Sequence, residues 1–490
     1  MDPSSDQQRE TLQAIARRLI LEHGLLPDYS PAALAELEKM QPPTYTASSA
    51  QRDLRDLLWA SIDNDDSMDL DQVTVAAPLA DDQIKVLVAI ADVDSLVKLG
   101  SAIDEHARQN TTSVYTSAEI FSMLPEKLST DFTSLAFNED RSAIVIELTI
   151  ASDGSVLHSD VYPAVVRNHA KLAYNSVAAW LEDTGPEPEG IPAVPGLAEN
   201  LKLQDRAAQQ LKNFRHLAGA LSLETIESKA QFNGDVVSNL EVESQNRATE
   251  IIEDFMIAAN QVTARFLPAH NLPSIRRVVR DPRQWDELIK LAAEYSFALP
   301  SAPDPKPLNE FLMKQKAADP LRFPDLSLAV IKLLGRGEYM AEIPGQAMPG
   351  HFGLAVSDYN HSTAPNRRYS DLITQRLLKA ALAGTPSPYT YTTLTALALQ
   401  CTDKEDDANQ VERKVGDCAA ALLLQPRIGN QFDALVTDTS PKGTWVRLLE
   451  LPVEGMLMQP GAGLSRGKQI RVQLVSVNVE LGFIDFKKVG

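Results

Sequence analysis

The sequence predicts an α+β protein in which a mixed sheet is surrounded by helices, preceded by a short helical module and followed by a small β-barrel of the OB type. Apolar and alternating runs between residues 57 and 166 are typical of strands. Helical periodicity dominates 284–336 and 368–425, and glycine-punctuated short strands fill 431–486. We therefore expect an N-terminal module at 1–45, a main domain at 46–427 and a barrel domain at 428–490.

Composition limits the classes of function. The formal charge of -20 argues against binding of nucleic acid over the whole surface, although a confined basic channel could still hold phosphates. No apolar run of about 18 residues occurs, so we expect no membrane span. The start lacks a basic region followed by an apolar stretch, which predicts no secretory signal. Cys401 and Cys418 lie in one helical segment, where a disulfide is unfavourable, so a reducing cytoplasm is expected.

The N-terminal module should contain two helices. Residues 7–22 carry apolar side chains at helical spacing, and Ser30 followed by Pro31 is typical of a cap and a first helical position. The second helix should end near Met40. The pair could form a helix-turn-helix or winged module, or a helical hairpin packed on the main body. Residues 41–49 are typical of a linker.

The main domain should begin with strands and a hairpin. Strands are expected at 84–91, 144–150 and 156–166, with a short helix at 101–109 that Ser101 caps. The Pro-rich and Glu-rich stretch 183–196 predicts an exposed loop. Asn233 and Gly234 separate two strand-like runs, 224–231 and 236–242, which predicts a β-hairpin.

An acidic stretch at 61–72 follows an apolar strand and leads into an alternating one, which predicts strand, loop, strand. Carboxylates packed this closely must face water or share a cation, and variably spaced oxygen ligands suit Mg²⁺ or Mn²⁺. A solvated acidic loop is the alternative. A calcium loop would need a glycine at its turn and a terminal glutamate, which are missing. The aspartates are Asp63, Asp65, Asp66, Asp69 and Asp71.

Two further segments carry polar groups in apolar surroundings. In the predicted helix 247–260, Glu253 and Asn260 share one face, as functional residues or as a buried hydrogen-bonding pair that stabilises packing. The arginines of 274–283 could contact phosphate or form a solvated face. In 351–372, Arg367 and Arg368 stand where a helix begins, where forked donors and the helix dipole favour phosphate binding. We assign no catalytic role to His351 and His361.

With these stretches in hand, residues 50–425 resemble the ribonuclease II (RNB) family of 3′→5′ exoribonucleases. The resemblance rests on Asp63, Asp69 and Asp71 at the family's acidic spacing, followed by the motifs at 90–93, 112–115, 123–128, 253–260, 351–354 and 364–372. The terminal barrel is similar to the family's OB-type RNA-binding domain. Two features depart from the pattern. Gln72 replaces a fourth acidic residue, and the first 50 residues or so are too short for paired cold-shock barrels.

The resemblance implies processive hydrolysis of RNA from its 3′ end to nucleoside 5′-monophosphates. Asp63, Asp69 and Asp71 would hold Mg²⁺, with Mn²⁺ as an alternative and Gln72 as a weaker or water-bridged ligand. Asp71 and Arg367 would be catalytic, with Arg367 stabilising charge on the phosphate. The remaining site residues implied are RNA contacts: Arg368 as a second phosphate contact or an ion pair, Tyr115 and Tyr174 as base-stacking aromatics, and Glu253 and Asn260 at the terminal ribose.

The expected partner is single-stranded RNA, with structured RNA carrying a 3′ overhang as a second candidate, and we expect a monomer that does not bind membranes. Aromatic side chains of the barrel could stack bases or fill its core. A catalytically weak or inactive RNA-binding relative is the main alternative, because Gln72 breaks the acidic set. A helix-turn-helix transcription factor is a third reading, which the net charge disfavours.

Overall fold

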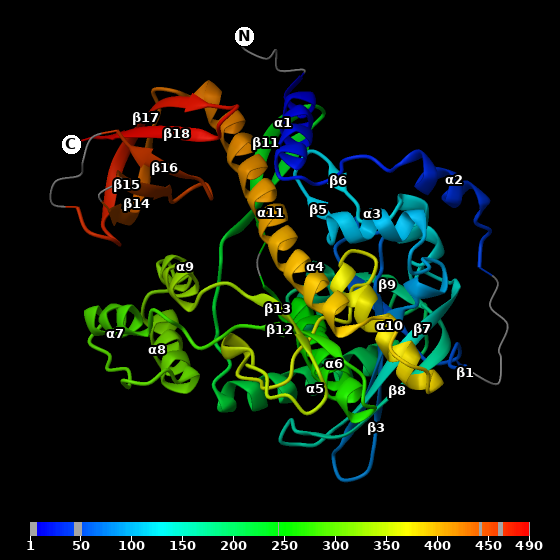
Figure 1. The fold of residues 1–490 in the computed structure, drawn as a ribbon. Coiled ribbons are helices and arrows are strands. Elements are labelled where there is room, and N and C mark those ends of the chain that lie inside the picture. The colour runs from blue at the N-terminus through cyan, green and yellow to red at the C-terminus, as the bar shows by residue number, and fades with distance from the viewer. Residues whose placement is uncertain (1–6, 44–50, 244, 441–442, 459–463, 490) are drawn as a thin grey trace.

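The computed structural model describes residues 7–43, 51–243, 245–440, 443–458 and 464–489 (Figure 1). The predicted absence of a secretory signal rests on the first six residues, which lie outside the described part of the chain. Residues 44–49 of the predicted linker, and the expected boundary at 45/46, lie outside it as well. No helix among the described residues is long and apolar enough to cross a membrane.

A seven-stranded mixed sheet forms the centre of the molecule, in the order β1-β8-β7-β4-β3-β2-β9. The β1–β8 and β2–β9 pairs are parallel, and the remaining pairs are antiparallel. The inner strands are apolar on both faces, since helices cover the sheet. The predicted mixed sheet is confirmed. Its strands are β1 Arg52–Asp53, β2 Ala60–Asp63, β3 Gln72–Pro78, β4 Ile84–Ala91, β7 Asp140–Ile150, β8 Val156–Arg167 and β9 Ala170–Ala173.

Helices surround this sheet (Figure 1). The long helix α6, Arg247–Ala269, starts with a capping box at Asn246 and buries Phe255 and Ala259 in the core of the sheet. The 34-residue helix α11, Tyr391–Leu424, runs from this core to the C-terminal barrel. Cys401 and Cys418 are both buried on it as free thiols. The other helices are α3 Ala102–Asn110, α4 Tyr174–Leu181, α5 Leu197–Ala218, α7 Trp285–Glu294, α8 Pro305–Ala318, α9 Phe323–Leu334 and α10 Tyr369–Ala383.

The two N-terminal helices, α1 Gln8–Glu22 and α2 Pro31–Lys39, are present as predicted. Ser30 caps α2 by accepting a hydrogen bond from the Ala33 N–H, with Pro31 in the first turn. They pack on different parts of the molecule: α1 lies against α11 and against strand β11, Val236–Glu243, and α2 lies against α3. The two helices therefore pack on the main body, as one of the two sequence alternatives proposed, but on different parts of it and not together as a hairpin.

Among the described residues, three two-stranded antiparallel sheets accompany the central one, and the first two are hairpins: β5 Val114–Tyr115 with β6 Ile120–Phe121, β10 Glu227–Asn233 with β11 Val236–Glu243, and β12 Ser274–Val278 with β13 Glu338–Glu342. The predicted turn at Gly234 is confirmed, and its φ of 62° explains the glycine. The arginines of 274–283 are mostly internal ion-pair partners. Arg276 pairs with Glu342, Arg277 with Glu405 and Arg280 with Glu338. Neither sequence reading, phosphate contact nor solvated face, describes the buried Arg276.

The C-terminal strands close into a barrel in the order β14-β15-β16-β18-β17. This order, with β14 joined to β17, is the topology of an OB fold and confirms the prediction. Phe432 and Phe486 fill the barrel core, whereas Phe483 is exposed. The strands are β14 Gln431–Ser440, β15 Gly443–Leu448, β16 Glu454–Leu457, β17 Gln469–Asn478 and β18 Phe483–Lys488.

Candidate active site

The acidic loop connects the end of β2 at Asp63 to the start of β3 at Gln72, as the sequence predicts. Its base is held by the Ser134 hydroxyl, which accepts from the Leu70 N–H at 3.0 Å and donates to the Met68 carbonyl at 2.7 Å. Asp65 and Asp66 remain exposed, whereas the Asp71 side chain is buried. The loop therefore divides its aspartates into an outer pair and an inner group.

Asp71 meets Arg367 at the centre of this site, although the two lie 296 residues apart in the sequence. The Arg367 Nε donates to Asp71 Oδ2 at 3.2 Å, and the Asn366 N–H donates to Asp71 Oδ1 at 3.1 Å. Burial raises the pKa of the Asp71 carboxyl to about 7, while Arg367 opposes that rise and Asp69 adds to it. The predicted convergence of the acidic loop with the downstream arginine is therefore observed.

The charge of Asp69 acts on both Asp63 and Asp71, and so does the charge of Arg367. Asp63 Oδ1 accepts from the Asn64 N–H at 2.8 Å and from the Ser67 hydroxyl at 3.0 Å. Burial raises the pKa of the Asp63 carboxyl, and the charges of Arg367 and Asp69 act on it in opposite directions. A cation would relieve the repulsion between these carboxylates.

The donor chemistry fits Mg²⁺, which is commonly held by one or two carboxylates together with water and phosphate oxygens. Within the described ranges, however, no three acidic, histidine or cysteine side chains are grouped closely enough to hold an ion by themselves. Gln72 starts β3 and is buried, and its side-chain amide makes no hydrogen bond within the described chain. These residues therefore fit a site that water and substrate complete.

Two tyrosines border the inner carboxylates. Tyr115 is 40% exposed, and its hydroxyl donates to Asp69 Oδ2 at 3.2 Å. Tyr174 begins α4 and is half-buried. Burial raises the pKa of its phenol, with a further rise from Asp63 and an opposing effect from Arg367. Both aromatic rings that the resemblance implied therefore lie beside the acidic loop.

Glu253 and Asn260 share α6 but have different surroundings. Glu253 is exposed and accepts a long hydrogen bond from Gln245 at 3.5 Å. Partial loss of water around its carboxyl raises the pKa of that group. Asn260 is only 2% exposed. Its Oδ1 accepts from the Ser362 N–H at 2.8 Å and the Ser362 hydroxyl at 2.9 Å. This geometry favours the packing role that the sequence left open for Asn260.

The adjacent arginines also differ. The Arg367 side chain is 44% exposed, and among the described residues only its Nε has a hydrogen-bond partner. Arg368 Nη2 donates to Asp371 Oδ1 at 2.7 Å, and this carboxyl is fully buried. Of the two roles predicted for Arg368, the contacts favour the structural ion pair. Arg367 keeps its two terminal nitrogens available.

Sequence reasoning missed a buried network behind Arg367. The Thr263 hydroxyl on α6 contacts Asn360 Oδ1 and the Ser362 hydroxyl, each at 2.8 Å. His351 and His361 lie nearby as neutral rings, because burial lowers the pKa of His351 to about 4 and that of His361 also well below its usual range. The polar run 360–363 was the only sequence signal for this network, and nothing in it identifies Thr263 as a partner.

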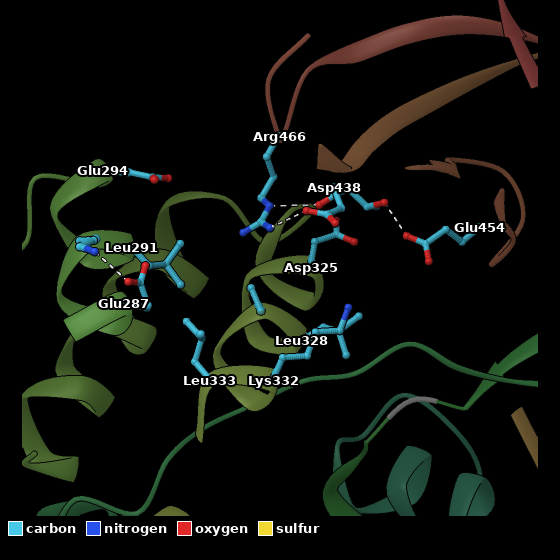
Figure 2. Close-up of a pocket in the computed structure, with 13 residues that line it drawn as sticks. Glu287, Leu291, Glu294, Asp325, Leu328, Lys332, Leu333, Asp438, Glu454 and Arg466 are labelled. Atoms are coloured by element: carbon cyan, nitrogen blue, oxygen red, sulfur yellow. Dashed lines mark hydrogen bonds and ion pairs between the residues drawn. The ribbon is translucent and has the colours of Figure 1, made fainter. Parts of the chain in front are cut away.

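A separate cleft of about 410 Å³ lies between helices α7 and α9 and the barrel. Figure 2 shows the ion pair that joins Arg466 to Asp438. Lys290 pairs with Glu287 on another wall of the cleft. Acidic side chains outnumber basic ones on its walls, and none of the predicted site residues lines it. The cleft is therefore poorly suited to phosphate groups.

Comparison with known proteins identifies the family. Residues 51–384 match the model of the RNB domain, and residues 430–489 match the RNase II-type exonuclease C-terminal S1 domain. The chain belongs to the RNB-domain family, as the sequence motifs predicted.

Individual relatives are ribonucleases. The chain is 30% identical to Ribonuclease R of Escherichia coli K12 over 483 residues, covering 91% of this chain and 58% of the relative. It is 31% identical to Exoribonuclease 2 of Shigella flexneri over 412 residues, covering 82% and 61%. The chain thus spans about three fifths of the length of these relatives.

Solved structures share the fold. Mycoplasma genitalium RNase R in complex with ribose methylated single-stranded RNA matches with a TM-score of 0.86 at 20% identity, covering 98% of this chain and 78% of that one. Yeast Ssd1, described as a pseudonuclease, matches with a TM-score of 0.71 at 18% identity, covering 90% and 55%. At these identities the likeness concerns the fold alone.

Proposed function

We propose that the protein is a metal-dependent 3′→5′ exoribonuclease that hydrolyses RNA processively to nucleoside 5′-monophosphates. The observation that carries the proposal is the contact between Asp71 and Arg367, with Asp63, Asp69 and two tyrosines beside it. Carboxylates for a cation, a guanidinium for phosphate and aromatic rings for bases are the groups that this reaction needs.

Asp63, Asp69 and Asp71 would hold Mg²⁺ or Mn²⁺, with the Gln72 carbonyl as an additional or water-bridged ligand. When bound, the metal would lower the pKa of a water and stabilise the leaving 3′-oxygen. Arg367 would direct its two unpaired terminal nitrogens toward the scissile phosphate and stabilise the charge that develops on it. Its contact with Asp71 orients the guanidinium before substrate arrives.

Tyr115 and Tyr174 would stack on bases near the 3′ end and so set where the chain is cut. The hydrogen bond from the Tyr115 hydroxyl to Asp69 fixes one edge of that ring. Glu253, which is exposed, would accept a hydrogen bond from the terminal ribose, where a 2′-hydroxyl distinguishes RNA from DNA. Asn260 and Arg368 would act indirectly, by fixing the loop that carries Arg367.

We infer that residues 46–427 act as the catalytic unit of a monomer and that 428–490 guide RNA toward it. Single-stranded RNA is the proposed substrate. One structural neighbour is RNase R in complex with double-stranded RNA, so RNA with a duplex and a 3′ overhang is the second substrate proposed. Buried free thiols at Cys401 and Cys418 are compatible with the cytoplasmic location we propose.

A catalytically weak RNA-binding protein is the alternative function. Gln72 supplies a neutral oxygen at the fourth position of the acidic set, and one neighbour of the same fold is a pseudonuclease. The retained contact between Asp71 and Arg367 favours an active enzyme over this alternative.

Digestion of one oligoribonucleotide labelled at either end tests the proposal. With Mg²⁺, the 3′-labelled RNA should lose its label as mononucleotide at once, while the 5′-labelled RNA should pass to a short end product without ladder intermediates. Chelation by EDTA should stop both. RNA that is bound but never shortened at any Mg²⁺ or Mn²⁺ concentration would establish the alternative function.

A further inference from the structure

The hairpin that carries Tyr115 cannot be stable by itself. β5 and β6 pair through only two registered residue pairs, and they form a sheet separate from the central one. An isolated two-stranded hairpin is marginal in water. At its base, the Ser113 N–H and the Thr112 hydroxyl both donate to the carbonyl of Arg367, at 3.0 and 3.2 Å. The hairpin therefore links the stacking tyrosine to the catalytic arginine.

Helix α1 supplies support at the opposite end of the hairpin (Figure 1). Arg17 Nη1 donates to Glu119 Oε1 at 2.9 Å, and Gln13 Nε2 donates to the Ala118 carbonyl at 3.4 Å. The buried hairpin residues Val114, Ala118 and Phe121 belong to the same apolar cluster as Leu12, Ile15, Ala16, Leu19 and Ile20 of α1. The helix thus contacts the turn of the hairpin through two polar side chains and shares an apolar cluster with the hairpin.

Arg17 is the centre of this contact. Its Nη2 donates to both carboxylate oxygens of Asp28, at 2.6 and 2.7 Å, while its Nη1 reaches Glu119. One guanidinium therefore ties the hairpin turn to the segment between α1 and α2. The turn closes on itself because the Thr116 hydroxyl donates to the Glu119 carbonyl at 2.6 Å, which couples Glu119 to the strand that bears Tyr115. The Tyr115 N–H is held separately by Glu412 of α11, at 2.7 Å.

We propose that α1 positions Tyr115 through the Arg17–Glu119 pair, and so sets the strength of base stacking and the length of the final undigested oligonucleotide. The inference rests on the proposed function and gives the N-terminal helices a role in the same site. Arg17 is a positioning residue here: it touches neither substrate nor metal, and acts through the hairpin.

The variant Arg17→Ala tests this, with Arg18→Ala as the matched control, because Arg18 is the next residue on α1 and pairs instead with Glu22 and Glu480. In EDTA, stacking is read from the quenching of 2-aminopurine placed near the 3′ end of an oligoribonucleotide. Arg17→Ala should weaken the quenching-derived affinity about two- to fivefold, as for loss of an exposed ion pair. Tyr115→Ala should weaken it about tenfold or more.

With Mg²⁺, Arg17→Ala should lengthen the end product by about one nucleotide or more and raise KM for short oligonucleotides, with kcat on long RNA nearly unchanged. Arg17→Lys should restore part of the effect. Glu119→Ala should mimic Arg17→Ala, and the double variant should be no worse than either single one, with thermal melting confirming that each variant is folded.

Three results would overturn the inference: unchanged quenching and end product in Arg17→Ala, the same loss in Arg18→Ala, or fully additive effects of Arg17→Ala and Glu119→Ala. Failure of the proposed function looks different. In that case wild-type protein would leave RNA intact with Mg²⁺, while the quenching measurement would still show whether Arg17 positions Tyr115.

Discussion

The two loops that meet at the candidate active site are held in place in opposite ways. In the loop 359–366, which carries Arg367 at its end, buried side chains interlock: Asn360, Ser362 and Thr363 are each less than 4% exposed. The acidic loop 64–71 is anchored mainly at its base by Ser134, and its outer aspartates remain in water. One loop is held by its own buried side chains, and the other carries carboxylates whose charges repel one another.

The difference indicates that one loop would supply a guanidinium in a fixed position and the other would supply carboxylates for a cation. A guanidinium can be fixed in advance because its hydrogen-bond partners are protein groups such as Asp71. Carboxylates that repel one another are stabilised when water solvates them, when one takes up a proton or when a cation joins them. Substitutions at the two loops are therefore expected to differ in whether they lower the rate of hydrolysis or the free energy of unfolding.

The largest effect is expected from Asp71→Asn, at the contact between the loops. The amide keeps an oxygen for the Asn366 N–H but removes the charge that would bind metal. Hydrolysis should fall by about 100-fold or more, with folding and RNA affinity largely retained. Single-turnover rates and filter binding measure this, with Asp65→Asn in the exposed part of the loop as the control. Rates near wild type would remove Asp71 from the site.

The adjacent arginines should separate catalysis from stability. Arg367→Ala should slow hydrolysis by about 100-fold, and its effect on folding should be the smaller of the two, because Asp71 keeps the Asn366 N–H and its raised pKa allows it to take up a proton. Arg368→Ala leaves Asp371 buried without its partner and should cost about 3 kcal/mol or more of unfolding free energy. Urea unfolding and turnover are measured on both variants. An unstable Arg367→Ala beside a stable, inactive Arg368→Ala would reverse the assignment.

Asn260→Ala tests whether the interlocked loop matters through its rigidity. Two donors of Ser362 lose their acceptor, so unfolding free energy should fall by about 1–3 kcal/mol. Hydrolysis should slow by about tenfold as Arg367 loses its alignment, with the preference for RNA over DNA unchanged. Glu253→Gln on the same helix is the comparison and should reduce that preference. Loss of RNA preference in Asn260→Ala instead would support the ribose contact predicted from the sequence.

Acid should destabilise the protein beside the loop 359–366 through His351, whose ring centroid lies 5.4 Å from that of Tyr359. Burial and Arg277 lower the pKa of His351 to about 4, so between pH 6.5 and 4 the unfolded chain binds a proton that the folded protein excludes. Its contribution to stability is complete above pH 6.5 and declines as pH falls, by about 3 kcal/mol at most. In His351→Asn, which keeps an acceptor for the Leu354 N–H, urea midpoints should depend less on pH in this range. An identical pH slope would contradict the assignment.

Much of the architecture followed from local patterns. Alternation and turn residues predicted the strands, the hairpin at Gly234 and the five-stranded barrel, because side-chain period and glycine conformations are properties of a short segment. The spacing of Asp63, Asp69 and Asp71, together with the downstream motifs, identified the family. Residues that belong to one sequence motif can, however, have different surroundings in the folded protein.

The sequence by itself therefore determined the fold class, the family and the two segments that form the candidate site. Only the tertiary structure separated Arg367 from Arg368, and Glu253 from Asn260, because the burial of each side chain depends on segments distant in the chain. It also decided that α1 supports the Tyr115 hairpin and that the N-terminal helices pack apart. No local signal links Arg17 to Glu119 across 102 residues, and such pairings form only when a common apolar core brings both segments together.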